Sequence, residues 1–214
     1  MSKQRSFLYA VLFTSVVAFL AGLLLVGTNA LLKDRIETNI LNERYRALFA
    51  LAGVDVSNES GANIKKLYAE RFSQKRLTGG RERLTYTSPK GETTHIYPLR
   101  GMGFWGPIHG FIALDGALTK IRGLVFTRQE ETPGLGAEIT THRFLSQLKG
   151  KQITASAAST QIILAIKKAG EAKGANQIDG ITGATETTMR VNSIIRGVLA
   201  GAVADRTRGG AHGN

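Results

Sequence analysis

The chain has 214 residues, 43% of them hydrophobic and 21% charged, a balance typical of folded globular proteins and unlike that of disordered chains. It contains no cysteine, which excludes disulfides, thiolate-ligated iron–sulfur clusters, thiol nucleophiles and sulfur-based zinc sites, and its four histidines have no metal-ligand spacing. The net charge of +12 suits an anionic membrane surface. The basic residues are scattered and do not form the stripe with interleaved aromatic residues that nucleic-acid binders show, so we expect no nucleic-acid partner. The cysteine and histidine content gives no reason to expect a metal site.

An uncharged apolar run extends from Phe7 to Gly27 near the start of the chain. A helix of this length crosses the roughly 30 Å hydrocarbon core of a bilayer. Lys3 and Arg5 precede the run, so the positive-inside rule predicts a cytoplasmic N-terminus and an extracytoplasmic body at the cell inner membrane. A cleaved signal peptide is the competing interpretation, but apolar cores of signal peptides are shorter, about 7–15 residues. Residues 1–30 are therefore expected to be a single-span anchor in the lipid bilayer.

The segments that follow the apolar run alternate between helical and strand patterns. Helical spacing predicts an amphipathic stalk over residues 31–55 and a helix from Val56 to Phe72, before a break at Gly79-Gly80. From Leu84 to Thr127, strand-like runs and the Asp115-Gly116 pair predict an antiparallel meander with a tight hairpin turn.

Three further elements are expected after the meander. They are a short helix from His142 to Lys149, a strand from Thr160 to Lys168, and a final helix from Glu186 to Val203. The apolar face of the final helix is expected to hold Met189, Ile194, Ile195, Val198 and Leu199. Residues 206–214 are expected to form a disordered tail. The predicted fold is α+β: one N-terminal transmembrane helix, then a single domain over residues 56–205 with an antiparallel sheet and flanking helices.

A loop of small and hydroxyl residues leads into the final helix, with the sequence Asp179-Gly180-Ile181-Thr182-Gly183-Ala184-Thr185-Glu186. The free amides and positive dipole end of a helix N-terminus stabilise a phosphate, and Gly183 and Ala184 leave room for its approach. On spacing alone, ordinary capping by Thr182 or Gly183 is the simpler interpretation.

Two motifs resemble those of the FMN-binding domain family. Asp179-x-x-Thr182-Gly183-Ala184-Thr185 resembles its flavinylation motif, and Glu131-Thr132-Pro133-Gly134-Leu135-Gly136 is similar to its ETPGLG segment, in the family's order. The similarity extends roughly from Tyr97 to Leu199. Residues 101–105 resemble the C subunit of sodium-pumping NADH:quinone oxidoreductases, whereas residues 106–108 are closer to the G subunit of Rnf complexes. The type of parent complex therefore stays open.

This resemblance implies a covalently bound FMN. A dedicated flavin transferase would form a phosphoester to Thr185, the second threonine of the motif, beside Thr182, Gly183 and Ala184. Asp179 would help the transferase to recognise or activate the acceptor; its alternative role is to cap the loop.

The ETPGLG segment and one aromatic residue are the remaining candidates for cofactor contact. Gly134 and Gly136 would let the backbone of the segment that begins with Glu131 and Thr132 lie close to the flavin ring, with Leu135 packing on the ring face. In isolation this segment is an ordinary surface turn. Trp105 is a candidate second wall of the flavin site or, alternatively, a core residue.

The function implied by the resemblance is electron transfer within a membrane-bound, ion-translocating oxidoreductase complex. Neighbouring subunits would supply the donor and acceptor sites, so no catalytic residue is assigned and the subunit is not a complete enzyme. The alternative is a membrane-anchored, flavin-dependent sensory or regulatory module.

Overall fold

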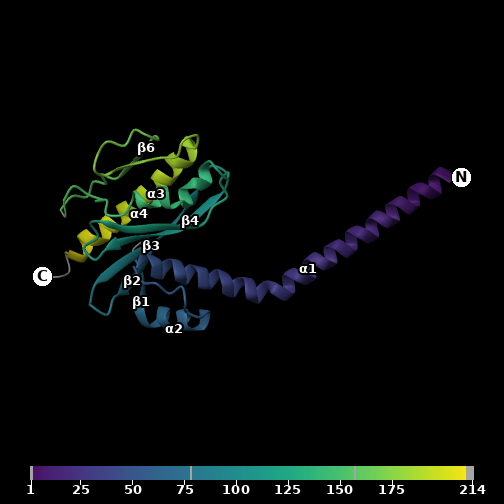
Figure 1. Cartoon of the computed structure of the whole chain (residues 1–214), viewed down its shortest axis with the longest axis horizontal. Coiled ribbons are helices and arrows are strands. Elements are labelled where there is room, and N and C mark those ends of the chain that lie inside the picture. Colours follow the sequence, from purple (N-terminus) through teal and green to yellow (C-terminus); the bar gives the residue numbers. More distant parts are fainter. Residues whose placement is uncertain (1, 78, 157, 211–214) are drawn as a thin grey trace. The chain divides into compact units, whose positions relative to one another are not determined.

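The computed structural model describes residues 2–77, 79–156 and 158–210 (Figure 1). The chain divides into two compact units, Met1–Glu43 and Arg44–Asn214.

The first unit is the greater part of helix α1 (Ser2–Leu51). All side chains from residue 7 to residue 41 are exposed, including the whole apolar run. The helix is long and apolar enough to cross a membrane, as the sequence predicts.

The last turns of α1 belong to the second, globular unit, which begins at Arg44. Leu48 and Phe49 are completely or almost completely buried in it. The helix ends at Leu51, and Gly53 adopts a left-handed conformation, with φ of 79°, that closes the C-terminus. The segment predicted as a stalk up to residue 55 is thus shorter, and its end is part of the domain core.

A five-stranded antiparallel sheet forms the centre of the globular unit. Its strands are β1 (Phe72–Arg76), β2 (Glu82–Thr87), β3 (Thr93–Met102), β4 (Pro107–Asp115) and β5 (Ile121–Arg128), in that spatial order. The meander predicted from Leu84 onward is confirmed, and so is the turn after Asp115, whose carboxylate accepts a hydrogen bond from the Thr119 amide at 2.7 Å.

The helix predicted from Val56 to Phe72 is wrong at both ends. Helix α2 covers Gly61–Arg71 and starts at Ser60, whose hydroxyl accepts a hydrogen bond from the Asn63 amide. Phe72 begins β1 instead, because its backbone pairs with Tyr86 and its ring packs edge-on against the ring of Phe49, with centroids 5.1 Å apart. Tertiary contacts of the aromatic ring therefore decide this boundary.

Helices cover both faces of the sheet. The end of α1 and helix α2 pack on one face, around Leu48, Phe49 and Ile64. Helices α3 (His142–Ser146) and α4 (Thr185–Gly210), the 3-10 helix η1 (Gly136–Thr140) and the parallel pair β6 (Ala165–Lys167) and β7 (Gln177–Asp179) cover the other face. Figure 1 shows α2 and α4 on opposite sides of the sheet. The predicted α+β class is confirmed.

Two predicted elements before α4 are longer than the observed ones. The strand expected from Thr160 to Lys168 is reduced to the three residues of β6, because only these pair with β7. The helix expected from His142 to Lys149 ends at Ser146, and turns follow it.

Helix α4 begins one residue earlier than predicted and continues further. Met189 is 56% exposed and does not belong to its apolar face, whereas Val191 is completely buried. Residues 206–210 are helical, so the expectation of disorder is wrong for them; residues 211–214 lie outside the described part. The Arg206 guanidinium fixes this end of the helix by donating hydrogen bonds to the Leu118 carbonyl (3.2 Å) and the Ser159 carbonyl (2.7 Å).

Candidate functional site

Thr185 is the first residue of α4 and is exposed. It borders a cavity of about 370 Å³, which is also lined by Thr182, Lys167 and Lys168. The N-terminus of a 26-residue helix favours an anion. Two lysines and one acidic residue, Glu171, line the same cavity, which leaves an excess of positive charge. This position is therefore suited to a phosphate group next to the Thr185 hydroxyl.

The loop before Thr185 is held against the first turn of α4. Gly183 has a φ of 76°, in the left-handed region that glycine adopts without strain. The Ala184 amide donates to the Ile181 carbonyl at 3.2 Å, and the Ile181 amide donates to the hydroxyl of the buried Thr188 at 3.2 Å. These bonds fix the place from which the Thr185 side chain projects.

The ETPGLG segment forms a tight turn next to this loop. The Thr132 carbonyl accepts hydrogen bonds from the amides of Leu135 and Ala137, both at 3.1 Å, and Gly134 has a φ of 73°. Leu135 lies against Gly183: a Cβ placed on that glycine would be 3.1 Å from Leu135 Cδ2. The structure thus brings the two predicted motifs into direct contact.

Glu131 is 5% exposed and connects three segments. Its Oε1 accepts hydrogen bonds from the amides of Phe104 (2.7 Å) and Trp105 (3.2 Å), in the β3–β4 connection. Its Oε2 accepts one from the hydroxyl of Thr187 in α4, at 2.6 Å. Both carboxylate oxygens are therefore occupied by donors from the protein itself.

Trp105 is 67% exposed, which excludes its alternative role as a core residue. Its ring packs edge-on against Phe104, with centroids 5.0 Å apart. Among the described residues after α1, the exposed large apolar side chains are Met102, Phe104, Trp105, Leu135 and Met189. All five lie on the segments that Glu131 and the Leu135–Gly183 contact hold together. Such a grouping is typical of a ligand or partner site.

Asp179 is the last residue of β7 and borders a second cavity, of about 630 Å³, together with Arg143, Gln147 and Thr182. Its Oδ1 accepts a hydrogen bond from the Ala172 amide at 3.0 Å. Its own amide donates to Gln147 Oε1 at 2.8 Å. The contacts of Asp179 in this chain are thus those of a loop-capping residue.

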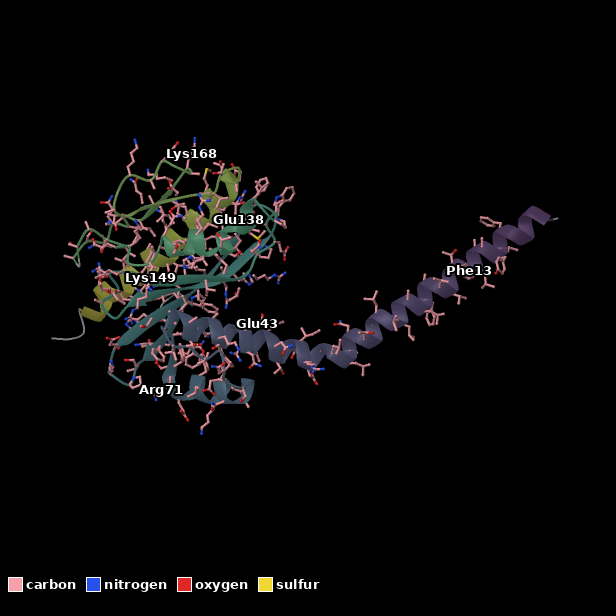
Figure 2. All side chains as sticks on the ribbon, in the orientation of Figure 1. Phe13, Glu43, Arg71, Glu138, Lys149 and Lys168 are labelled. Carbon is pink, nitrogen blue, oxygen red and sulfur yellow. The ribbon has the colours of Figure 1, made fainter. Side chains whose placement is uncertain are left out.

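Thr182 borders both cavities, and so do Ala169 and Ile181. Lys168, at the first cavity, and Glu138, at the second, lie on the opposite side of the sheet from Arg71 (Figure 2). Both volumes fall in the usual range of small-molecule sites, about 300–1,000 Å³. In the described residues, no group of three or more acidic or histidine side chains is placed to hold a metal ion.

The sequence provided no signal for several residues of this site. Thr187 and Thr188 are ordinary helix residues until the fold places them beside Glu131 and Ile181. Gln147 likewise pairs with Asp179 across a separation of 32 positions, which no local pattern indicates.

Residues 103–200 match the FMN-binding domain family. This segment of the chain is similar to an FMN-binding domain. The matched range includes both motifs and, Met102 excepted, the exposed apolar side chains described above. The resemblance inferred from the two motifs is therefore confirmed.

The chain is also similar to known proteins over most of its length. It is 27% identical to the C subunit of the Na(+)-translocating NADH-quinone reductase of Pseudomonas aeruginosa, over 91% of this chain and 92% of that one. Identity to the corresponding C subunit of Chlamydia pneumoniae is 37%, but over 43% of this chain and 33% of that one.

Two solved structures share the fold. The crystal structure of the C subunit of the Na(+)-translocating NADH-quinone reductase from Parabacteroides distasonis superposes with a TM-score of 0.68 at 26% identity, covering 82% of this chain and 97% of that chain. The Shewanella oneidensis NqrC superposes with a TM-score of 0.60 at 19% identity, covering 76% of this chain, which is a likeness of fold.

Proposed function

We propose that this protein is a membrane-anchored electron-transfer subunit of a complex of the Na(+)-translocating NADH-quinone reductase type, with FMN esterified to Thr185. The observation that carries the proposal is the placement of an exposed threonine at the N-terminus of α4, within a domain of the FMN-binding family. The similarity to the C subunit from Pseudomonas aeruginosa over nearly the whole chain supports the type of complex.

The residues around Thr185 fit the phosphate end of FMN. The helix N-terminus and the side chains of Lys167 and Lys168 would stabilise its negative charge, and the cavity beside Thr185 provides space for the ester. Thr182, Gly183 and Ala184 form the adjoining loop, in which the absence of bulky side chains permits close approach.

The ring of FMN would lie against the apolar side chains near the ETPGLG turn. Leu135, which lies against Gly183, and Trp105, whose amide donates to Glu131, are exposed and can contact a planar ring. The backbone of Thr132, Gly134 and Gly136 shapes the turn. FMN supplies the redox chemistry when bound, and the ester leaves the ring unmodified, so these neighbours set its potential. Their exposure leaves an edge accessible to a partner's cofactor.

Helix α1 would anchor the subunit in the cell inner membrane, with Lys3 and Arg5 on the cytoplasmic side and the FMN domain outside the cytoplasm. The other subunits of the complex would donate and accept the electrons. A flavin transferase would install the FMN, and Asp179 would contribute to recognition of the acceptor loop through the carboxylate oxygen that does not cap Ala172.

The test is coexpression of the full chain with a flavin transferase. A fluorescent band on a denaturing gel is expected, together with a mass increase of FMN less one water on the peptide that contains Thr185. Thr185→Val removes the hydroxyl and should abolish the band. Thr87→Val, which removes an exposed threonine hydroxyl outside both motifs, is the control and should keep it. Flavin that stays attached in Thr185→Val would contradict the proposed site.

The membrane complex is tested separately by purification from solubilised membranes. Copurification with several polytopic subunits supports an electron-transfer role. Recovery of the flavinylated protein alone, or with a signalling partner, would instead support a sensory or regulatory module.

A further inference from the structure

Glu131 has the burial and contacts of a residue that organises the flavin site without touching the flavin. We propose that it is a positioning residue: its carboxylate fixes the loop of Phe104 and Trp105 to α4, and so holds these two exposed aromatic side chains in place relative to Thr185. The part of this inference that concerns the flavin rests on the function proposed above.

The hydrogen bonds of Glu131 show that it acts as an acceptor only. Three donors point at its two oxygens: the amides of Phe104 and Trp105 and the hydroxyl of Thr187. A carboxylate that accepts several hydrogen bonds, one of them at 2.6 Å, is the arrangement of an ionised group. Hydrogen bonds of this kind are stronger than those between neutral groups, and leaving buried donors without a partner is costly.

Glycines surround the carboxylate where any larger residue would displace it. A Cβ on Gly136 would lie 2.7 Å from Glu131 Oε2 and 2.6 Å from the Thr187 hydroxyl, and a Cβ on Gly103 would overlap Oε1. Another glycine of the β3–β4 connection, Gly106, closes the loop by accepting a hydrogen bond from the Gly103 amide at 2.8 Å. These residues therefore form a closely packed site for the carboxylate.

The position of Glu131 along the chain gives these bonds their effect. Thr187 lies two residues after Thr185 in the same helical turn, and Glu131 itself begins the turn that carries Leu135. One side chain thus links the start of α4, the ETPGLG turn and the exposed aromatic pair. It also places a fixed negative charge inside the site, which opposes reduction of a neighbouring cofactor.

The first experiment uses the full chain made without a flavin transferase. Because Trp105 is the only tryptophan, its fluorescence anisotropy reports the mobility of this loop. Glu131→Ala should lower the anisotropy, since it leaves both amides without an acceptor. Glu131→Gln should keep it close to that of the unsubstituted chain, because the amide oxygen still accepts from Phe104 and Trp105. Thr187→Val, a milder change, should cause a smaller decrease.

The second experiment uses the flavinylated protein. Glu131→Gln should retain full FMN incorporation but shift the midpoint potential in the positive direction, because it removes a negative charge and keeps the geometry. Glu131→Ala should reduce incorporation and alter the visible circular dichroism of the flavin. Thermal unfolding of each variant separates these effects from a general loss of the fold, and Thr187→Val provides the same comparison if Glu131→Ala does not fold.

The outcomes distinguish this proposal from its alternatives. Equal Trp105 anisotropy in Glu131→Ala, Glu131→Gln and the unsubstituted chain would overturn the positioning role. Loss of FMN incorporation in Glu131→Gln with unchanged anisotropy would also overturn it, since Glu131 would then contact the flavin or the transferase directly. A chain that never acquires FMN would refute the proposed function, while the anisotropy comparison would still decide the role of Glu131.

Discussion

The last two turns of α1 should be essential for folding of the globular unit, although the rest of the helix is not. We expect a chain that starts at Arg44 to fold, and a chain that starts at Ala52 to be largely unfolded. The second truncation removes Leu48 and Phe49, which are 0% and 2% exposed and fill the two clusters under one face of the sheet.

The loss of unfolding free energy in the second truncation follows from the side chains that it removes. Truncating a buried leucine to alanine costs about 2–5 kcal/mol and a buried phenylalanine about 3–5 kcal/mol, so together these two positions contribute roughly 5–10 kcal/mol. The truncation also removes Arg46, whose guanidinium donates to the carbonyls of Val56 at 2.6 Å and Glu59 at 2.7 Å. Domains of this size unfold with about 5–15 kcal/mol in total, so the loss is comparable to the whole stability.

Urea unfolding followed by circular dichroism measures the difference. The chain from Arg44 should show a cooperative transition, which the chain from Ala52 should lack. In the full chain, Phe49→Ala should lower the unfolding free energy by about 3–5 kcal/mol. Leu41→Ala, an exposed position of the same helix, is the matched control and should change it by less than about 0.5 kcal/mol. Equal midpoints for the two truncated chains would refute the reasoning.

Three further changes test other parts of the domain. Gly183→Ala should destabilise the protein by about 1–2 kcal/mol and lower FMN incorporation. Alanine is strained at a φ of 76°, and its Cβ would lie 3.1 Å from Leu135 Cδ2. An unchanged thermal midpoint would contradict this prediction. Burial and, to a lesser extent, the nearby Arg83 cation lower the pKa of His95, so the folded state favours the neutral ring. The unfolding free energy should therefore fall as the pH drops through about 6.5, where the imidazole of the unfolded chain takes up its proton. His95→Gln should make this decline shallower in urea titrations between about pH 7 and pH 5. Arg206→Ala should cost about 1.5–3 kcal/mol and speed amide hydrogen exchange in the last turns of α4, whereas a disordered tail would show rapid exchange with or without the substitution.

The local sequence was sufficient for elements that depend on nearby residues. The apolar run from Phe7 predicts a long helix because length and hydrophobicity alone determine whether a segment can cross a bilayer. The strands from Leu84 onward follow from strand-like apolar runs and from the turn after Asp115. The Asp115 carboxylate stabilises this turn by accepting a hydrogen bond from the Thr119 amide, four residues further along. Two motifs sufficed to indicate the resemblance to the FMN-binding family, and the range that matches this family, residues 103–200, includes both.

Tertiary structure decided the features that depend on distant residues. Phe72 ends a helix and starts a strand because of the aromatic rings that it meets. Met189, which was expected on the buried face, is exposed, and Val191 is buried, because the sheet selects which side of α4 is buried.

The central contact of the candidate site is also invisible in the sequence. Glu131 and Thr187 are 56 positions apart, and no local pattern links them until folding places the hydroxyl 2.6 Å from the carboxylate. Sequence patterns record local conformational preference and burial, with periods of a few residues. The pairing of a buried acceptor with its donors depends on how the turn, the β3–β4 loop and α4 pack together, and that packing exists only in the folded chain.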